Sequence, residues 1–198
     1  MMILHDISKG VFRSKVYPGD PKPSAKAIKS ISNGDEYNLS QFTICPHTGT
    51  HIDAPLHFID DGDTIDKMDI RTFYGKCTVI TVDGILTGAD MDRILARSRK
   101  RILFRSKDEM VYLSSSAAQV IADNNTILVG TEALSIATSY EEEKTHRILL
   151  ENDVAILEGL NLSNIKDGEY EICAFPIKVE GLEAAPCRAV LFEQEKGI

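Results

Sequence analysis

Three of the chain's five histidines fall within one stretch of eleven residues that also holds an aspartate. The stretch contains His47, His51, Asp53 and His57. In an extended segment, residues two positions apart project to the same face, so His51 and Asp53 would point together. Gly49 permits a bend that could bring His47 toward the same point. Imidazole nitrogens and a carboxylate, without a thiolate, suit zinc or manganese and leave coordination positions open for water.

A histidine-rich surface loop is the alternative interpretation of this stretch. Threonine, alanine, leucine and phenylalanine surround the histidines, and this composition is not typical of a solvent-facing loop. Burying several ionisable groups without a ligand is costly, so the residue types favour a metal site. Pro55 excludes a regular helix through the stretch, so the zinc-binding helix with two histidines four residues apart is ruled out.

Two further residues, His146 and Glu158, fit the same chemistry. Glu158 interrupts residues 155–160, which otherwise have the pattern of a buried strand, and a carboxylate there must be paired or bound to a metal. His146 precedes Leu149 and Leu150 by three and four residues, which places it on the helix face that packs inward. An inward histidine alone is more often a satisfied core residue. In combination with Glu158 and the first stretch, His146 is predicted to be a metal ligand.

The composition is that of an ordinary globular chain and disfavours several classes of protein. Among 198 residues, 22 Lys and Arg against 30 Asp and Glu give a formal net charge of −8. A general nucleic-acid or anionic-membrane binder needs a basic face, so we expect neither partner. The one basic cluster, residues 97–101, is interpreted as a solvated helix end. No signal-peptide pattern, membrane-spanning apolar run or closely spaced cysteine pair is present, which predicts a cytoplasmic chain with reduced thiols.

Alternating strands and helices must position these residues. Short apolar or β-branched runs predict strands at 77–82, 102–104, 126–130, 154–160, 170–179 and 188–192. Helical patterns cover 89–98, a segment through Ala122 with an N-cap offered by Ser114-Ser115-Ser116, and 139–152. About 40 residues at the start are rich in turn formers, which predicts extended pieces and loops, with Asn33-Gly34 as a candidate hairpin turn. The pattern predicts an α/β class with a mixed sheet, in a single domain over residues 1–198.

The stretch HTGTHIDAPLHF, residues 47–58, resembles the signature of the metal-dependent cyclase family, which includes bacterial kynurenine formamidases and isatin hydrolases. Further likeness lies in residues 16–20, 167–170 and 186–190, so the resemblance covers nearly the whole chain in the expected order. It implies a swivelling β/β/α fold with a mixed, barrel-like sheet and peripheral helices. It also implies homo-oligomers, dimers or tetramers, with active sites near subunit contacts.

Carried over residue by residue, the resemblance implies a site for two divalent metal ions, zinc or manganese. His47, His51 and Asp53 would bind the first ion. Asp53 would also bridge to a second ion, which His146 binds and Glu158 shares.

The resemblance implies further roles for two residues. His57 matches the family's catalytic acid/base, and Tyr17 falls where formamidases place an aromatic residue, commonly Trp, against the substrate. Residues 105–123 look shorter than their counterpart in true formamidases, and residues 130–135 differ from the usual Asp- and Pro-containing version. Kynurenine formamidase activity is therefore one option among several.

The predicted reaction is hydrolysis of a small amide (an N-formyl arylamine such as N-formylkynurenine, or a cyclic amide) by a metal-activated water. His57, with an ordinary pKa of about 6.5, would take the proton of the water and return it to the leaving nitrogen. A cyclase or dehydratase of the same family would share the ligands, and only product analysis separates the two. A metal-stabilised binding protein without turnover is the third interpretation, and it would have a site closed by protein ligands.

Overall fold

Four apolar runs in the middle of the chain form parallel strands at the centre of the main sheet. In the computed structural model, which describes residues 1–194, they are β5 (Tyr74–Thr81), β7 (Arg101–Arg105), β9 (Leu128–Thr131) and β10 (Ala155–Glu158). The last four residues of the predicted domain lie outside this range. Both faces of β7, β9 and β10 are buried along most of their length, which explains their nearly continuous apolar sequences. In β7, for example, Ile102 and Phe104 belong to one core cluster and Leu103 belongs to the other.

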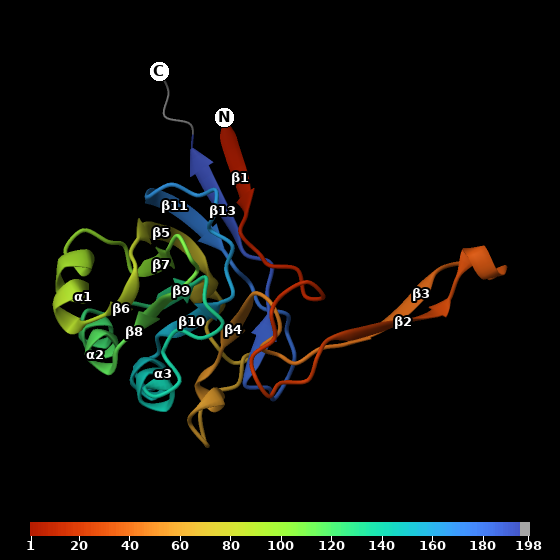
Figure 1. Cartoon of the computed structure of the whole chain (residues 1–198), viewed down its shortest axis with the longest axis horizontal. Coiled ribbons are helices and arrows are strands. Elements are labelled where there is room, and N and C mark those ends of the chain that lie inside the picture. The colour runs from red at the N-terminus through yellow and green to blue at the C-terminus, as the bar shows by residue number, and fades with distance from the viewer. Residues whose placement is uncertain (195–198) are drawn as a thin grey trace.

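Three helices lie together on one side of the sheet (Figure 1). They are α1 (Gly88–Leu95), α2 (Ser115–Asp123) and α3 (Glu142–Glu151). Of the three serines predicted to offer an N-cap, Ser114 caps α2, because its side chain accepts a hydrogen bond from the backbone N–H of Ala117. The helices bury apolar side chains, among them Met91, Ile121 and Leu149, against this face of the sheet. The core on this side therefore fixes the position of α3 relative to β10.

Antiparallel strands extend the sheet on both sides of its parallel centre. Beyond β5 follow β11 (Gly168–Cys173), β13 (Val190–Gln194) and β1 (Met2–Asp6), and beyond β10 follow β4 (His51–Asp53) and β12 (Ala184–Pro186). The nine-stranded sheet curls around the core cluster that contains Leu103 (Figure 1). Separately, β6 (Gly84–Leu86) and β8 (Val111–Leu113) form a parallel pair. The predicted α/β class with a mixed, barrel-like sheet and peripheral helices is confirmed.

A long hairpin, the arm (residues 24–43), projects away from the rest of the molecule (Figure 1). Its strands β2 (Ser24–Lys29) and β3 (Leu39–Thr43) pair with each other, and all their residues are exposed. A 3₁₀ turn, η1 (Ile31–Asn33), lies between them and ends at Gly34, which has a φ of 93°. The predicted hairpin is confirmed, although a longer connection than the Asn33-Gly34 pair alone joins its strands.

Several predicted element ends are wrong. The helix predicted over 89–98 ends at Leu95, and Arg101 belongs to β7. The Arg101 guanidinium donates to the backbone carbonyls of Arg71 and Thr72, so the basic cluster 97–101 is not one solvated helix end. The strand predicted over 170–179 ends at Cys173, shortly before Pro176, which has no N–H for a ladder hydrogen bond.

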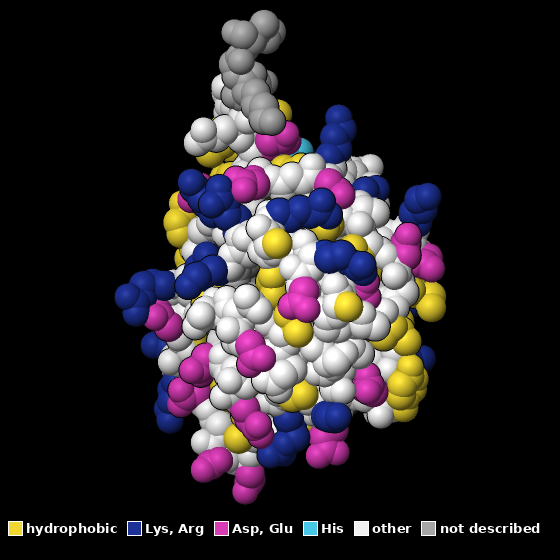
Figure 2. All heavy atoms as spheres, turned by 90° about the vertical axis from the view of Figure 1, so that its left-hand side faces the viewer, with side chains coloured by type: hydrophobic (Ala, Val, Ile, Leu, Met, Phe, Trp, Pro, Cys, Tyr) yellow, Lys and Arg dark blue, Asp and Glu magenta, His cyan; other side chains and the backbone are white. Residues whose placement is uncertain are grey.

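The helical side of the molecule carries charges of both signs. Figure 2 shows Lys and Arg mainly across the upper part of this side, Asp and Glu mainly below, and hydrophobic side chains in small groups. Scattered apolar side chains of this kind are normal on a protein surface. Among residues 1–194, no helix is both long enough and apolar enough to cross a membrane. All four cysteines are free thiols, as predicted.

Candidate metal centre

The pairing of β4 with β10 places three ionisable side chains on one face of the sheet. In this antiparallel pair His51 lies opposite Glu158, and Ile52 lies opposite Leu157. Because side chains alternate along a strand, His51, Asp53 and Glu158 share one face, whereas Ile52 and Leu157 enter the core on the other. A register shift of one residue between these two strands would turn His51 and Asp53 away from the face that carries Glu158.

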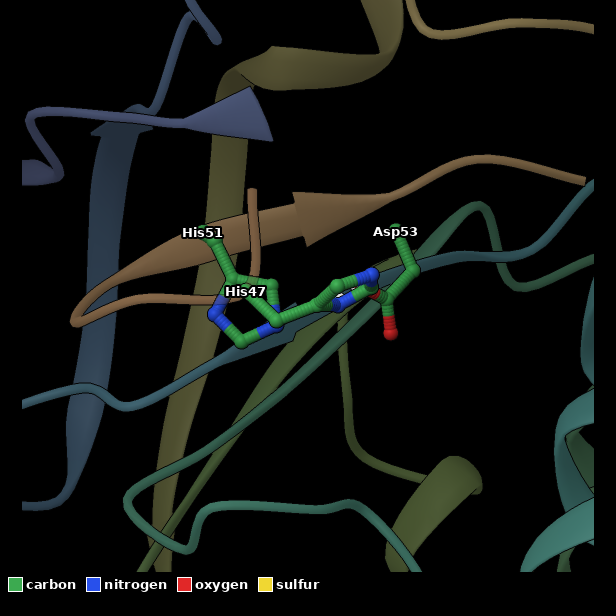
Figure 3. Close-up of side chains that lie close together, drawn as sticks. All are labelled: His47, His51 and Asp53. Atoms are coloured by element: carbon green, nitrogen blue, oxygen red, sulfur yellow. Dashed lines mark ion pairs between the residues drawn. The ribbon is translucent and has the colours of Figure 1, made fainter. Parts of the chain in front are cut away.

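Two histidines reach the same point from outside this strand pair. His146 lies on the buried face of α3, and His47 lies in the loop before β4. The bend predicted at Gly49 is present, with a φ of 75°. Figure 3 shows the side chains of His47, His51 and Asp53 close together, with His47 arriving from the loop that precedes β4. The structure therefore brings together all five residues that the sequence marked as metal ligands.

Asp53 lies at the centre of this cluster. Its Oδ1 atom is 3.0 Å from His47 Nδ1 and 3.3 Å from His51 Nε2, and its Oδ2 atom is 3.9 Å from His146 Nε2. Glu158 places Oε2 3.5 Å from His51 Nε2 and Oε1 3.4 Å from His146 Nε2. The first triad consists of His47, His51 and Asp53, and the second triad of Asp53, His146 and Glu158. Each triad could hold a metal ion, and the two share Asp53.

Backbone carbonyls fix the rings of two of the histidines. His51 Nδ1 lies 3.1 Å from the carbonyl oxygen of Gly49, and His146 Nδ1 lies 2.8 Å from that of Glu142. A carbonyl oxygen only accepts hydrogen bonds, so each Nδ1 must carry the proton. In the neutral ring this leaves Nε2 unprotonated and facing the carboxylates. A metal-ligating histidine is normally held in this way through its other ring nitrogen.

The cluster holds buried polar atoms that its own contacts do not satisfy. Asp53, His51, His146 and Glu158 are all buried. Within the described part of the chain, His51 Nε2 and both carboxylate oxygens of Asp53 lack a hydrogen-bond partner, although they lie at ion-pair distances from one another. No Lys or Arg of residues 1–194 lies at ion-pair distance from either carboxylate. Nitrogen and oxygen donors that face a shared centre without bonding one another fit a divalent cation such as zinc or manganese.

Burial and charge shift the pKa values of this cluster in opposite directions. Burial alone would lower the pKa of His51, but the carboxylates of Asp53 and Glu158 outweigh burial and raise it well above its usual value. Burial alone would raise the pKa of Asp53, but His47 and His51 hold it well below its usual range. Protons on the histidines thus neutralise the carboxylates, and a cation that binds here must displace those protons.

The predicted catalytic residue, His57, lies beside the cluster in a 3₁₀ turn, η2 (Pro55–His57). Its ring centroid is 4.2 Å from that of His47 and 5.9 Å from that of His146. Burial lowers the pKa of His57, so its ring is neutral near pH 7. None of residues 1–194 forms a hydrogen bond with this ring. The ring is therefore able to accept a proton from a group bound next to the cluster.

Tyr17, the predicted substrate contact, lines an open cavity of about 870 Å³. Most of the cavity wall comes from the loops 8–18, 108–112 and 132–139, and the cavity reaches Gly49 and Gly159 at the ends of the two site strands. The Tyr17 hydroxyl donates to Glu142 Oε2 at 2.8 Å. Burial and this carboxylate raise the pKa of Tyr17 to about 12, so the phenol stays protonated. The five clustered side chains are not part of the cavity wall.

Three residues around the site were missed by the sequence reasoning. Glu142, which holds His146 through its carbonyl, lies four residues earlier on the same helix, and this spacing could have indicated it. The Phe58 ring, at the end of the motif, packs 4.6 Å from the His146 ring, centroid to centroid. The backbone N–H of Ile136 donates to Glu158 Oε1 at 2.7 Å. No sequence pattern marks Ile136, because nearly every residue has such a donor.

Comparison with known proteins adds independent similarities. A family model described as "Putative cyclase" matches residues 5–138. A protein of Erythrobacter litoralis (strain HTCC2594) named "Kynurenine formamidase" is 32% identical over 193 residues, which cover 90% of this chain and 88% of that protein.

Solved structures share the arrangement of the whole chain. One, described as a "predicted metal-dependent hydrolase from Bacillus stearothermophilus", is 29% identical with a TM-score of 0.85 and covers 98% of this chain and 100% of its own. Another, isatin hydrolase A from Labrenzia aggregata bound to benzyl benzoate, has a TM-score of 0.84 and covers 98% of this chain and 94% of its own. At 20% identity, this second likeness concerns the fold alone.

At Gly159 the segment that carries Glu158 closely approaches the loop before His51. Gly159 follows Glu158 with a φ of 65°, and a Cβ atom there would lie 2.3 Å from the carbonyl oxygen of Gly49. We expect Gly159→Ala to lower the free energy of unfolding by about 3 kcal/mol or more, because backbone strain and this collision add. Zinc binding should weaken as well, because the loop before His51 must move away from Glu158.

Gly84→Ala is the matched control, since Gly84 has a φ of 74° but nothing within 4 Å of the added Cβ. Its free energy of unfolding should fall by only about 1–2 kcal/mol, which is the cost of a left-handed backbone for a residue with a side chain. Denaturant unfolding and zinc titration of both variants measure the difference. An equal loss in the two variants would show that the approach of Gly49 to Gly159 does not constrain the site.

Proposed function

Because the chain belongs to the cyclase family, as its motifs predicted, we propose that it is a metal-dependent hydrolase of a small amide. The observation that carries the proposal is the pair of triads sharing Asp53, with the unbonded His57 ring beside them. The name of the Erythrobacter relative supports an N-formyl arylamine, such as N-formylkynurenine, as substrate. A cyclic amide is the second candidate substrate, and the cavity at Tyr17 has room for either.

We propose that the two triads hold two divalent cations, zinc or manganese, with Asp53 between them. The unpartnered oxygens of Asp53 and the orientation of His51 and His146 support this assignment. Bound cations of this kind lower the pKa of a coordinated water to about 7 and polarise a carbonyl group.

His57 is the proposed acid/base of the reaction. Its neutral ring takes the proton of the attacking water and returns it to the leaving nitrogen, a transfer typically worth about 10²–10⁴ in rate. The Tyr17 side chain, anchored by Glu142, is proposed to contact the substrate from the cavity wall. Because its phenol stays protonated, Tyr17 can donate a hydrogen bond but cannot act as the base.

Two other functions use the same residues. A cyclase or dehydratase of the family would have the same ligands and would differ only in its product. A metal-stabilised binding protein would need no acid/base, and the His57 ring without a hydrogen bond favours catalysis over this alternative.

Alanine substitutions separate the proposed ligands from the proposed acid/base. We expect His51→Ala and Asp53→Ala to lose both metal and activity, and His57→Ala to keep its metal while turnover falls by about 10²–10⁴. His5→Ala is the control, since His5 pairs with Glu193 on strands at the opposite end of the sheet order from β4. Metal analysis and assays with N-formylkynurenine, isatin and cyclic imides provide the measurements.

Each outcome bears on a different assignment. A metal-replete and active Asp53→Ala variant would refute the ligand set, and a fully active His57→Ala variant would remove His57 from the mechanism. A metal-loaded wild type that is inactive on every amide would favour the cyclase or binding alternatives.

We also propose that the chain forms a homo-oligomer, a dimer or tetramer, in which the arm contacts a second copy. A two-stranded hairpin is only marginally stable in water by itself. The arm nevertheless exposes Ile28, Leu39 and Phe42 by 49%, 44% and 59%. Its strands also carry Lys26 and Lys29, whose charges complement a chain with a net charge of −8. A second copy would cover the apolar side chains and stabilise the hairpin.

The double variant Ile28→Ser/Phe42→Ser tests the arm. We expect it to elute as a monomer of about 21.9 kDa, because the apolar contact is removed, while the wild type has a multiple of this mass. Ile85→Ser, which changes a side chain of similar exposure (46%) on β6, should keep the wild-type mass. Size-exclusion chromatography with light scattering measures all three. A monomeric wild type, or a double variant of unchanged mass, would contradict the proposal.

A further inference from the structure

The third histidine of the cluster is oriented the other way round from the first two. His51 and His146 turn Nε2 inward and give Nδ1 to a backbone carbonyl. His47 instead turns Nδ1 toward Asp53, at 3.0 Å, and its Nε2 lies 3.5 Å from Glu183 Oε1. The outer nitrogen of His47 therefore faces a carboxylate, where the other two rings face carbonyl groups.

The backbone around Glu183 is fixed next to the site. Its carbonyl oxygen accepts a hydrogen bond from the N–H of Ala54 at 2.8 Å, directly after Asp53. The next residue, Ala184, begins β12 and lies opposite Asp53 in the pairing of β12 with β4. The position of the carboxylate relative to His47 is thus set by the same strand that presents Asp53.

Within residues 1–194, the Glu183 carboxylate has no partner other than His47. No Lys or Arg lies at ion-pair distance, and no side-chain hydrogen bond to it is present. About one third of the side chain is exposed, so the carboxylate also contacts solvent. When a metal ion takes Nδ1 on the side of Asp53, the proton of the neutral ring can lie only on Nε2, and the negative charge of Glu183 stabilises it there.

We propose that Glu183 is a positioning residue for His47, which holds the proton on Nε2 and so directs Nδ1 at a metal ion in the first triad. A carboxylate behind a metal-bound imidazole fixes its orientation and raises its basicity. The inference rests on the proposed function, because it requires a metal ion in that triad. It concerns the first triad alone, since the histidine of the second triad is oriented by the carbonyl of Glu142.

Zinc titration calorimetry of the full chain tests this role. We expect Glu183→Ala to weaken one of two zinc-binding steps by about 10-fold to 100-fold, the usual effect of removing such a partner. Glu183→Gln should weaken it less, because the amide keeps an oxygen that is able to accept from Nε2–H but has no charge. Glu180→Ala is the matched control, since Glu180 is an exposed carboxylate in the same segment without an ion pair among the described residues.

A spectroscopic measurement separates positioning from a general structural role. Long-range proton–nitrogen correlation spectra of the zinc-loaded protein show which ring nitrogen binds zinc and which carries the proton. We expect zinc on Nδ1 of His47, with the proton on Nε2, and the reverse arrangement for His51 and His146. In Glu183→Ala the Nε2 proton signal of His47 should broaden or vanish, while those of the other two histidines remain.

Two results would overturn the inference. One is zinc bound through Nε2 of His47 in the wild type, and the other is a Glu183→Ala variant that binds zinc as the wild type does. If the wild type binds no zinc, this inference and the proposed metal site both fail. Unchanged zinc binding in Glu183→Ala, together with zinc loss in Asp53→Ala, overturns the role of Glu183 alone.

Discussion

The fully buried carboxylate of Asp53 is the constraint on which the site depends. An isolated charge in a protein interior is heavily penalised, and Asp53 has neither a Lys or Arg partner nor a hydrogen bond among the described residues. Three histidines face its two oxygens instead, and Glu158 adds a second negative charge nearby. Such a group is stable only if protons or cations neutralise it. Because histidines lie on both sides of Asp53, we propose that two cations bind there.

The fold meets this constraint by holding four of the five proposed ligands on paired strands or on a buried helix face, while His47 lies in the loop before β4. His51, Asp53 and Glu158 lie on paired strands whose other face is packed into the core, so their direction follows from the register. The buried face of α3 brings His146 to the same side. Rigid positioning of this kind keeps the ligands in place before a cation binds, which lowers the cost of binding. The exposed arm carries none of the five proposed ligands.

The sequence predicted the site better than it predicted the site's surroundings. Spacing alone placed His51 and Asp53 on one face, and the apolar residues around Glu158 and His146 marked both as buried, because these are local patterns. The resemblance then correctly indicated the family and the curled mixed sheet. Contacts such as Ile136 to Glu158, or Gly49 to Gly159, depend on long-range pairing and backbone atoms that leave no residue-type signal. The ends of helices and strands were wrong where tertiary contacts decided, as at Arg101.

Anomalous diffraction from crystals grown with zinc tests most directly whether the Asp53 carboxylate lies between two bound cations. We expect two peaks at the zinc absorption edge, one on each side of the Asp53 carboxylate. One should lie beside His47 and His51, and the other beside His146 and Glu158. A cluster without any peak, or zinc bound only at positions that Asp53 does not touch, would contradict this arrangement.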